Sequence, residues 1–231
     1  MRPTILLFDI DGTLVSTGGA GRRSIDRAFE TLHGRADACS HFSFDGMTDR
    51  GIARLGLEAI GVTVTDANVD ALLARYVACL EDAVRSVPDE RYIVHEGVRA
   101  AVDAGIAAGM AVGLGTGNVR EGARVKLARV GLFEKFTFGG FGDDHELRPE
   151  LIRRGAERGA LQLGVELSAS RVVVIGDTPK DVAAAQAMGA ESIGVATGGF
   201  TVEQLRASGA THVFATLADV RAIPAMLDVS N

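Results

Sequence analysis

Short runs of apolar residues recur along the chain, and most of them are stopped by glycine or by acidic residues. Runs of this length are typical of strands that are buried on both faces of a parallel sheet. Helical spacing of apolar residues separates most of the runs, which favours right-handed crossovers. The pattern therefore predicts an α/β fold, a Rossmann-like and mostly parallel sheet with helices on both faces. The expected strands cover residues 5–8, 110–114, 136–138, 171–177, 192–196 and 212–214.

Between residues 22 and 87 the strand signals vanish and only helical spacing remains. Flexible links flank this segment: a glycine-rich stretch precedes it, and Pro88 follows it. Asp66 is a plausible N-cap of the last helix there, and Gly61 is a plausible stop for the helix before. We expect helices at residues 22–32, 50–60 and 67–86. The predicted organisation is an all-helical cap domain, residues 17–91, inserted into a core formed by residues 1–16 and 92–231.

Composition and net charge limit the classes of function that this chain could have. The 231 residues carry a formal net charge of −6, which argues against a nucleic-acid surface, so an anionic substrate would need a local metal or arginine. Cys39 and Cys79 form neither a metal pattern nor a disulfide framework, which favours a reducing compartment. We expect no signal peptide, because the first strand begins close to the N-terminus, and no membrane span, because the longest uncharged stretch, residues 104–119, is slightly too short. We expect a soluble, cytoplasmic protein without a membrane partner.

Two acids, Asp9 and Asp11, close the first apolar run and lean to one side of an extended chain. Gly12 permits a sharp turn and Thr13 adds a hydroxyl. Carboxylates at the end of a buried strand repel each other, and a divalent cation with oxygen ligands would compensate them. An ordinary Asp–Gly turn is the alternative. A calcium-binding loop of the EF-hand kind is excluded, because Leu14 stands where that loop needs glycine.

A second candidate follows the expected strand at residues 110–114. The Thr116 hydroxyl and the free backbone N–H groups of the next helix would form an anion site, with a plain glycine-rich turn as the alternative. A dinucleotide fingerprint read from Gly113 would need glycine at Asn118, and the chain contains no Gly-Lys-Ser/Thr phosphate loop.

A third candidate closes the β-branched run that ends at Asp177. Asp181 follows four residues later, in the first turn of a helix that Pro179 opens. Asp181 alone could be a residue that complements the helix dipole, but that interpretation leaves Asp177 at a buried strand exit unexplained.

In this order the segments resemble the motifs of the haloacid dehalogenase superfamily of aspartate-nucleophile phosphatases. Residues 9–13 match Asp-x-Asp-Gly-Thr, Thr116 matches the second motif, and residues 176–181 match Gly-Asp-x-x-x-Asp. Arg148 beside Pro149 stands where the family carries a lysine or arginine, and Lys126 is the rival for that role. With its helical insertion the chain is similar to the helical-cap subfamily, which includes phosphoglycolate phosphatase and β-phosphoglucomutase.

The resemblance implies Mg²⁺-dependent hydrolysis of a small phosphorylated metabolite, a phosphate monoester. Asp9 would attack phosphorus and form an aspartyl-phosphate, and Asp11 would serve as general acid and base. Mg²⁺ would be held by Asp9, the backbone carbonyl of Asp11, Asp177 and, mostly through water, Asp181. The phosphoryl oxygens would be held by Thr116, by the amides of Gly117 and Asn118, and by Arg148.

Three other functions stay open at this point. A phosphotransferase or mutase of the same family shares this machinery. A carbon–halogen hydrolase of the superfamily needs no metal and lacks the second acid of the first motif, so Asp11 and Asp177 argue against it. A signalling module phosphorylated on Asp9, like a response-regulator receiver, is about half this length and carries no helical insertion.

The polar link between the first two predicted cap helices is the candidate for substrate selection. Residues 44–50 resemble the Gly-x-Thr-Asp stretch that capped relatives lay over the active site, which implies that Thr48 and Arg50 bind substrate. The alternative is a solvated turn whose Asp49 caps the helix beginning near Arg50.

Overall fold

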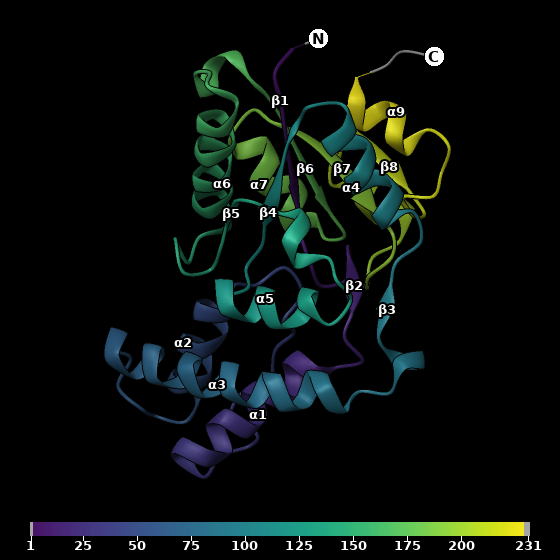
Figure 1. Cartoon of the computed structure of the whole chain (residues 1–231). Helices are drawn as coiled ribbons and strands as arrows, with labels where there is room; N and C mark the ends of the chain where they lie inside the picture. Colours follow the sequence, from purple (N-terminus) through teal and green to yellow (C-terminus); the bar gives the residue numbers. More distant parts are fainter. Residues whose placement is uncertain (1, 229–231) are drawn as a thin grey trace.

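The computed structural model describes residues 2–228. Met1 and residues 229–231, which belong to the range predicted for the core, lie outside the described residues. Six parallel strands form the main sheet in the order β5-β4-β1-β6-β7-β8, as Figure 1 shows. The strands are β1 Thr4–Phe8, β4 Ala111–Gly115, β5 Gly139–Gly140, β6 Arg171–Gly176, β7 Glu191–Val195 and β8 His212–Phe214.

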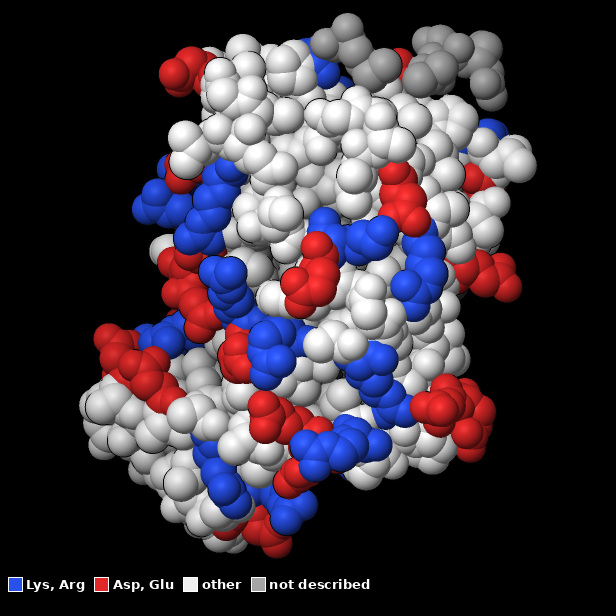
Figure 2. Space-filling model, viewed as in Figure 1, with Lys and Arg blue, Asp and Glu red and all other residues white. Residues whose placement is uncertain are grey.

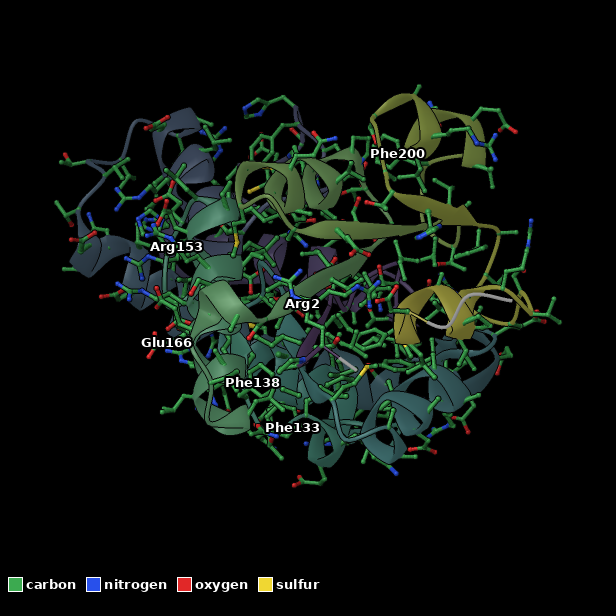
Figure 3. All side chains as sticks on the ribbon, turned by 90° about the horizontal axis from the view of Figure 1, so that it is seen from above. Arg2, Phe133, Phe138, Arg153, Glu166 and Phe200 are labelled. Carbon is green, nitrogen blue, oxygen red and sulfur yellow. The ribbon has the colours of Figure 1, made fainter. Side chains whose placement is uncertain are left out.

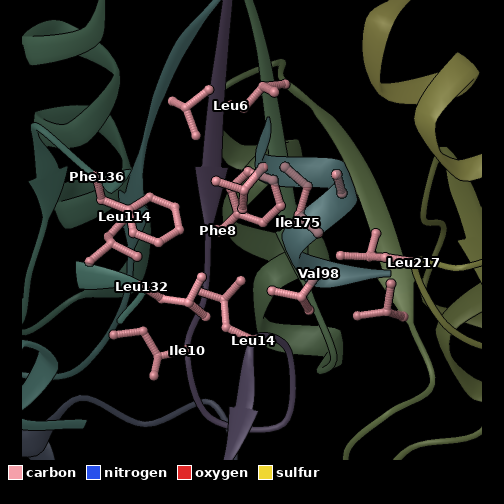
Figure 4. Close-up of a cluster of buried hydrophobic side chains, with 14 of the residues drawn as sticks. Leu6, Phe8, Ile10, Leu14, Val98, Leu114, Leu132, Phe136, Ile175 and Leu217 are labelled. Carbon is pink, nitrogen blue, oxygen red and sulfur yellow. The ribbon is translucent and has the colours of Figure 1, made fainter. Parts of the chain in front are cut away.

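Strand β1 lies at the centre of the sheet because it is apolar on both faces. It pairs with β4 on one side and β6 on the other, so that Leu6 lies opposite both Val112 and Val173. Side chains alternate across a strand. Leu6 and Phe8 therefore join one hydrophobic cluster, shown in Figure 4, and Ile5 and Leu7, which alternate with them, join the cluster on the opposite face.

Helices cover both faces of the sheet, which confirms the predicted fold class (Figure 3, seen from above). On one face α6 and α7 pack against the sheet, and on the other face α4, α5 and α9 do so. The core helices are α4 Val98–Ala107, α5 Arg120–Ala128, α6 Arg148–Leu163, α7 Pro179–Ala187, α8 Val202–Ala207 and α9 Ala222–Leu227. Short 3-10 helices are η1 Asp89–Arg91, η2 Phe133–Lys135 and η3 Leu167–Ala169.

The segment between β2 and β3 is helical, as expected, and its three helices share a separate hydrophobic cluster beside α5 (Figure 1). They are α1 Ala20–His33, α2 Asp49–Ala59 and α3 Asp66–Ser86. The N-caps differ from the expectation by one residue: the side chains of Thr48 and Thr65 accept the capping hydrogen bonds, whereas Asp49 and Asp66 occupy the first helical position. Threonine and aspartate both cap helices, so the sequence alone does not choose between neighbours.

The two stretches of chain that lead into and out of these helices pair with each other as a two-stranded antiparallel ribbon. It consists of β2 Val15–Ser16 and β3 Ile93–Val94. The Ser16 hydroxyl and the His95 Nε2 atom are 3.1 Å apart, and the His95 backbone N–H donates to the Leu14 carbonyl. Neither strand was expected from the sequence, because two residues carry no periodicity.

The strand expected at residues 136–138 is displaced toward its C-terminus. Only the Phe138 carbonyl of that stretch reaches β4, where it accepts from the Leu114 backbone N–H, and β5 itself is Gly139–Gly140. Glycine is required there by space, since a methyl group on Gly140 would lie 1.8 Å from the Leu151 carbonyl oxygen of α6. Two glycines give no β signal in a sequence, which explains the error.

In the part of the chain that the structure describes, no helix combines the length and apolar character that crossing a bilayer requires. On the face drawn in Figure 2, acidic and basic side chains are interspersed.

We predict that Gly140→Ala lowers the free energy of unfolding by about 1–3 kcal/mol, because the added methyl group overpacks the contact between β5 and α6. Urea denaturation followed by circular dichroism measures the change. Gly199→Ala is the control, since no atom lies within 4 Å of a methyl group at that position. Equal unfolding free energies of both variants would contradict the packing argument.

Candidate active site

The chain leaves the sheet at the carboxyl end of β1 and places Asp9 and Asp11 there. Asp9 is buried and its backbone N–H donates to the Ile175 carbonyl of β6, whereas the Asp11 side chain is 46% exposed. Gly12 then turns the chain with a φ of +80°. A methyl group at Gly12 would lie 2.3 Å from Asp177 Oδ2, so only glycine lets the first loop approach the end of β6.

Three buried acids meet at this edge of the sheet. One carboxylate oxygen from each of Asp9, Asp177 and Asp181 lies within 4.8 Å of the others. The Asp177 carboxylate accepts a hydrogen bond from the Thr13 hydroxyl, and Asp181 closes a capping box with Thr178 at the start of α7. An all-oxygen set of this kind suits a hard divalent cation such as Mg²⁺, so the residues fit the metal that the motifs imply.

Burial shifts the acidity of the cluster. It raises the pKa of Asp9 to about 6, against the opposing effect of the Arg148 guanidinium. It raises the pKa of Asp177 to about 8, and the neighbouring charges of Asp9 and Asp181 add to the effect. Without a cation, the site therefore retains a proton on Asp177 near neutral pH.

The Asp11 carboxylate is not part of the acid cluster. It accepts from Lys126 Nζ at 2.6 Å and from Asn118 Nδ2 at 2.8 Å, and Lys126 also donates to Asn118 Oδ1 at 2.6 Å. Metal ligation by the Asp11 backbone carbonyl stays a prediction. These contacts fix the position of the Asp11 carboxylate separately from the three acids of the cluster.

Arg148, rather than Lys126, contacts the predicted nucleophile. Its Nη2 atom lies 2.9 Å from Asp9 Oδ1 and 2.6 Å from Asp181 Oδ1, and its Nε donates to Asp181. The side chain is buried at the first residue of α6. The guanidinium therefore offsets the negative charge of two of the three acids from within hydrogen-bond distance.

The loop after β4 differs in part from its expected role. Thr116 is fully buried and hydrogen-bonds Asp9, while the Asn118 N–H donates to the Thr116 hydroxyl at 3.3 Å. The expectation of free N–H groups at the start of α5 is wrong. Carboxylates already accept from them: Val119 N–H donates to Asp49, and Arg120 N–H donates to Asp143. Gly117, Asn118 and the Thr116 hydroxyl remain as candidates for an anion.

The loop before α2 lies over the core loops. Asp49 N–H donates to the Gly117 carbonyl at 2.8 Å, Arg148 Nη1 to the Gly46 carbonyl at 3.4 Å, and the Thr48 hydroxyl to the Glu146 carbonyl at 3.1 Å. A methyl group at Gly46 would meet Thr178 and Lys180 at less than 3 Å. The loop therefore contacts the second, third and fourth motif regions.

The structure does not bring Thr48 and Arg50 to the acid cluster. Thr48 caps α2 and lines a neighbouring cavity, and Arg50 pairs with Asp70 at 2.7 Å and with Asp66 at 3.5 Å. In the described chain, the cavity that contains Asp9 is lined by neither side chain. Helix capping and ion pairing engage these two side chains, but the loop is not the solvated turn of the alternative interpretation, since Thr48 and Asp49 are buried. Substrate binding by Thr48 and Arg50 stays a prediction.

A cavity of about 270 Å³ connects the acids to the cap helices. The predicted site residues on its wall are Asp9, Asp11, Gly117, Asn118, Arg148 and Asp177. The sequence did not single out the side chains that the helical segment adds, which include Arg22, Ile25, Phe44, Ile52 and Tyr76. Three of these, Ile25, Ile52 and Tyr76, belong to apolar helix stripes that look like ordinary core positions, so no sequence signal separated them.

Comparison with known proteins agrees with this geometry. Residues 3–189 match the family described as haloacid dehalogenase-like hydrolase. The chain belongs to this family. It is also 28% identical over 237 residues to "Probable phosphatase IndB" of Dickeya dadantii, covering 100% of this chain and 97% of that protein.

Two solved structures share the fold. A hydrolase from Pseudomonas syringae superposes with a TM-score of 0.69 and 19% identity, covering 99% of this chain and 100% of the other. A beta-phosphoglucomutase from Clostridium difficile superposes with a TM-score of 0.73 and 15% identity, covering 99% and 98%. The family resemblance inferred from the motifs is therefore confirmed, and the chain is a hydrolase-family enzyme with a helical cap.

We predict that Mg²⁺ affinity rises with pH between about 6 and 8, because the cation must displace the proton on Asp177, whose pKa is about 8. The same raised pKa means that the metal-free folded protein binds this proton more tightly than the unfolded chain does. Its stability without metal therefore decreases as pH rises through this range. Isothermal titration calorimetry in buffers of different ionisation enthalpy measures affinity and proton release.

Asp177→Asn should abolish most of the binding and its pH dependence, whereas Asp103→Asn, which changes a surface pair with Lys135, should alter neither. Mg²⁺ affinity that is independent of pH in the unmodified protein would rule out this ligand assignment.

Proposed function

We propose that this enzyme is a Mg²⁺-dependent phosphatase that hydrolyses a small phosphate monoester through an aspartyl-phosphate on Asp9. One observation carries the proposal: buried Asp9 lies within a cluster of three acids and contacts the guanidinium of Arg148. A group with several negatively charged oxygens complements that arrangement, and a carboxylate nucleophile is already in place beside it. The phosphatase name of the Dickeya relative supports the same chemistry.

In the first half-reaction an Asp9 oxygen attacks phosphorus, and the bond from phosphorus to the ester oxygen breaks. Asp11 gives its proton to the departing oxygen, which leaves as an alcohol. In the second half-reaction Asp11 takes a proton from water, the water oxygen attacks phosphorus, and inorganic phosphate leaves Asp9 free again. Bound Mg²⁺ would neutralise the carboxylates and the phosphoryl oxygens when held by Asp9, Asp177 and Asp181.

The remaining side chains orient these groups. Arg148 and the Thr116 hydroxyl would bind phosphoryl oxygens, and both already contact Asp9. Lys126 and Asn118 hold the Asp11 carboxylate at the wall of the cavity. The acid–base group therefore faces the side where the alcohol leaves.

A phosphotransferase or mutase is the second candidate, because the fold is similar to that of a beta-phosphoglucomutase. Both reactions share the first half-reaction and differ in the acceptor, which is water or a sugar hydroxyl. Release of inorganic phosphate from a single ester in the absence of a second sugar phosphate favours the phosphatase. The two buried free thiols, Cys39 and Cys79, support the proposal that the enzyme works in the cytoplasm.

We predict that Asp9→Asn retains the fold and lowers kcat by about three orders of magnitude or more, since the amide cannot attack phosphorus. Phosphate release from p-nitrophenyl phosphate with Mg²⁺ measures the loss, and circular dichroism checks the fold. Asp103→Asn is the surface control and should retain full activity. Substantial metal-dependent turnover by Asp9→Asn would refute the nucleophile assignment.

We predict that Asp11→Asn lowers kcat/KM much more for an alkyl phosphate than for p-nitrophenyl phosphate, by about 100-fold in the ratio. A nitrophenolate leaves without protonation, whereas an alkoxide needs the proton from Asp11. The comparison of kcat/KM reports the first half-reaction only, so slow hydrolysis of the intermediate does not obscure it. Equal losses on both esters would argue for a purely structural role of Asp11.

A further inference from the structure

The helical segment gives the cavity an apolar wall. Ile25 of α1, Ile52 of α2 and Tyr76 of α3 are each more than nine-tenths buried and line the cavity together with Phe44 from the loop before α2. The α1 backbone at Gly21 also lines the cavity, and charged residues such as Arg22 and Asp49 complete the cap side. A leaving group bound against Ile25, Ile52 and the two rings therefore touches mainly carbon.

Each cation that lines the cavity in the described chain is already engaged. Arg148 contacts Asp9 and Asp181 and is assigned to the phosphoryl group. Lys126 donates to Asp11 and Asn118, and its side chain is only 4% exposed. The Asp11 carboxylate balances the charge of this ammonium, so a substrate anion beside it would compete with Asp11 for the same cation.

Arg22, the third cation, is tied to the cap itself. Its Nη2 and Nη1 atoms donate to the carbonyls of Cys39 and Phe42, and its Nε lies 3.5 Å from an Asp26 oxygen. Its guanidinium carbon lies 4.1 Å from the centre of the Phe44 ring. All three nitrogens are directed at the protein, so this arginine builds the wall instead of offering a free charge.

The cavity also contains an acid on the cap side. Asp49 is buried at the start of α2, and one carboxylate oxygen accepts from the Val119 N–H. Burial raises the pKa of Asp49 to about 6, so the group carries a negative charge through most of the neutral range. It repels a second anion and can accept hydrogen bonds from a hydroxyl or an N–H group.

We propose that the leaving group of the natural ester is a neutral alcohol with an apolar face, carrying no carboxylate and no second phosphate. The inference rests on the proposed phosphatase function and goes beyond it by giving the class of substrate. An apolar wall, engaged cations and a buried acid all disfavour a second anion, whereas the Tyr76 hydroxyl and Asp49 can hydrogen-bond polar groups of a neutral alcohol.

Matched pairs of esters test the charge requirement. Glycerol 3-phosphate and 3-phosphoglycerate differ in a hydroxymethyl group against a carboxylate, and benzyl phosphate and 4-carboxybenzyl phosphate differ in a single carboxylate. The kcat/KM for the neutral member of each pair should exceed that for the anionic member by about 100-fold, because the extra charge would be buried without a partner. Equal values, or a preference for 3-phosphoglycerate or phosphoglycolate, would overturn the inference.

A variant of the wall tests the apolar face. Phe44→Ala should reduce the preference for benzyl phosphate over glycerol 3-phosphate by about tenfold, because the ring loses an apolar contact. Leu57→Ala is the matched control: Leu57 lies on α2, is fully buried in the cap cluster and does not line the cavity. Leu57→Ala should change kcat/KM for benzyl phosphate and for glycerol 3-phosphate by the same factor. An equal change in the preference for benzyl phosphate in both variants would contradict the assignment of Phe44 to the apolar wall.

The same panel separates failure of the inference from failure of the function. If no ester is hydrolysed with dependence on Asp9, the phosphatase proposal is wrong and the substrate class falls with it. If esters are hydrolysed but the anionic members are preferred, the phosphatase proposal stands and only the inference about the leaving group is overturned.

Discussion

The repulsion between buried carboxylates at one edge of the sheet is the constraint on which the site depends. Asp9, Asp177 and Asp181 come from two strands and a helix and converge where little water can screen them. Arg148 offsets part of the charge, while burial and the charges of Asp9 and Asp181 still raise the pKa of Asp177. Without a bound cation, this surplus of negative charge lowers the stability of the folded state, and a bound cation removes the repulsion. Metal affinity and folding stability are therefore coupled through the charge balance of the site.

The same constraint explains why small residues surround the acids. Gly12 and Gly198 both lie so close to the Asp177 carboxylate that a methyl group on either would meet it within 2.3 Å. Gly176 leaves room for Asp181 in the same way. Glycine at these points lets main-chain segments approach the carboxylates closely, and that closeness leaves space only for a compact ligand.

Much of the fold follows from the sequence, because the strands that carry the site are continuous apolar runs. Strand β6 and the helices α1 to α3 lie within a few residues of their expected positions. The errors arise where the signal is local or absent: Gly139–Gly140 has no β propensity, and the choice between Thr48 and Asp49 as N-cap depends on the tertiary contacts of each side chain. Propensity could not supply either answer.

The site residues also divide into those that the sequence predicts and those that only the structure reveals. The acids, Thr116 and Arg148 occur in ordered motifs next to strand ends, so the sequence identified them before any coordinates. The partner of Asp11 required the structure, since the proximity of Lys126 depends on how α5 packs beside β1. The cap wall also required it: Ile25 and Tyr76 follow ordinary helical periodicity, and only the packing of three helices against one loop decides which apolar residues face a cavity.

The ribbon formed by β2 and β3 has a mechanical consequence. The chain passes from the sheet to the helices and back through two crossings, and backbone pairing holds these crossings side by side (Figure 1). Two paired strands bend together more easily than they slide past each other, because sliding breaks the hydrogen bonds between them. The three helices can therefore swing as one unit about this ribbon. Independent twisting of either strand is opposed by the pairing between them.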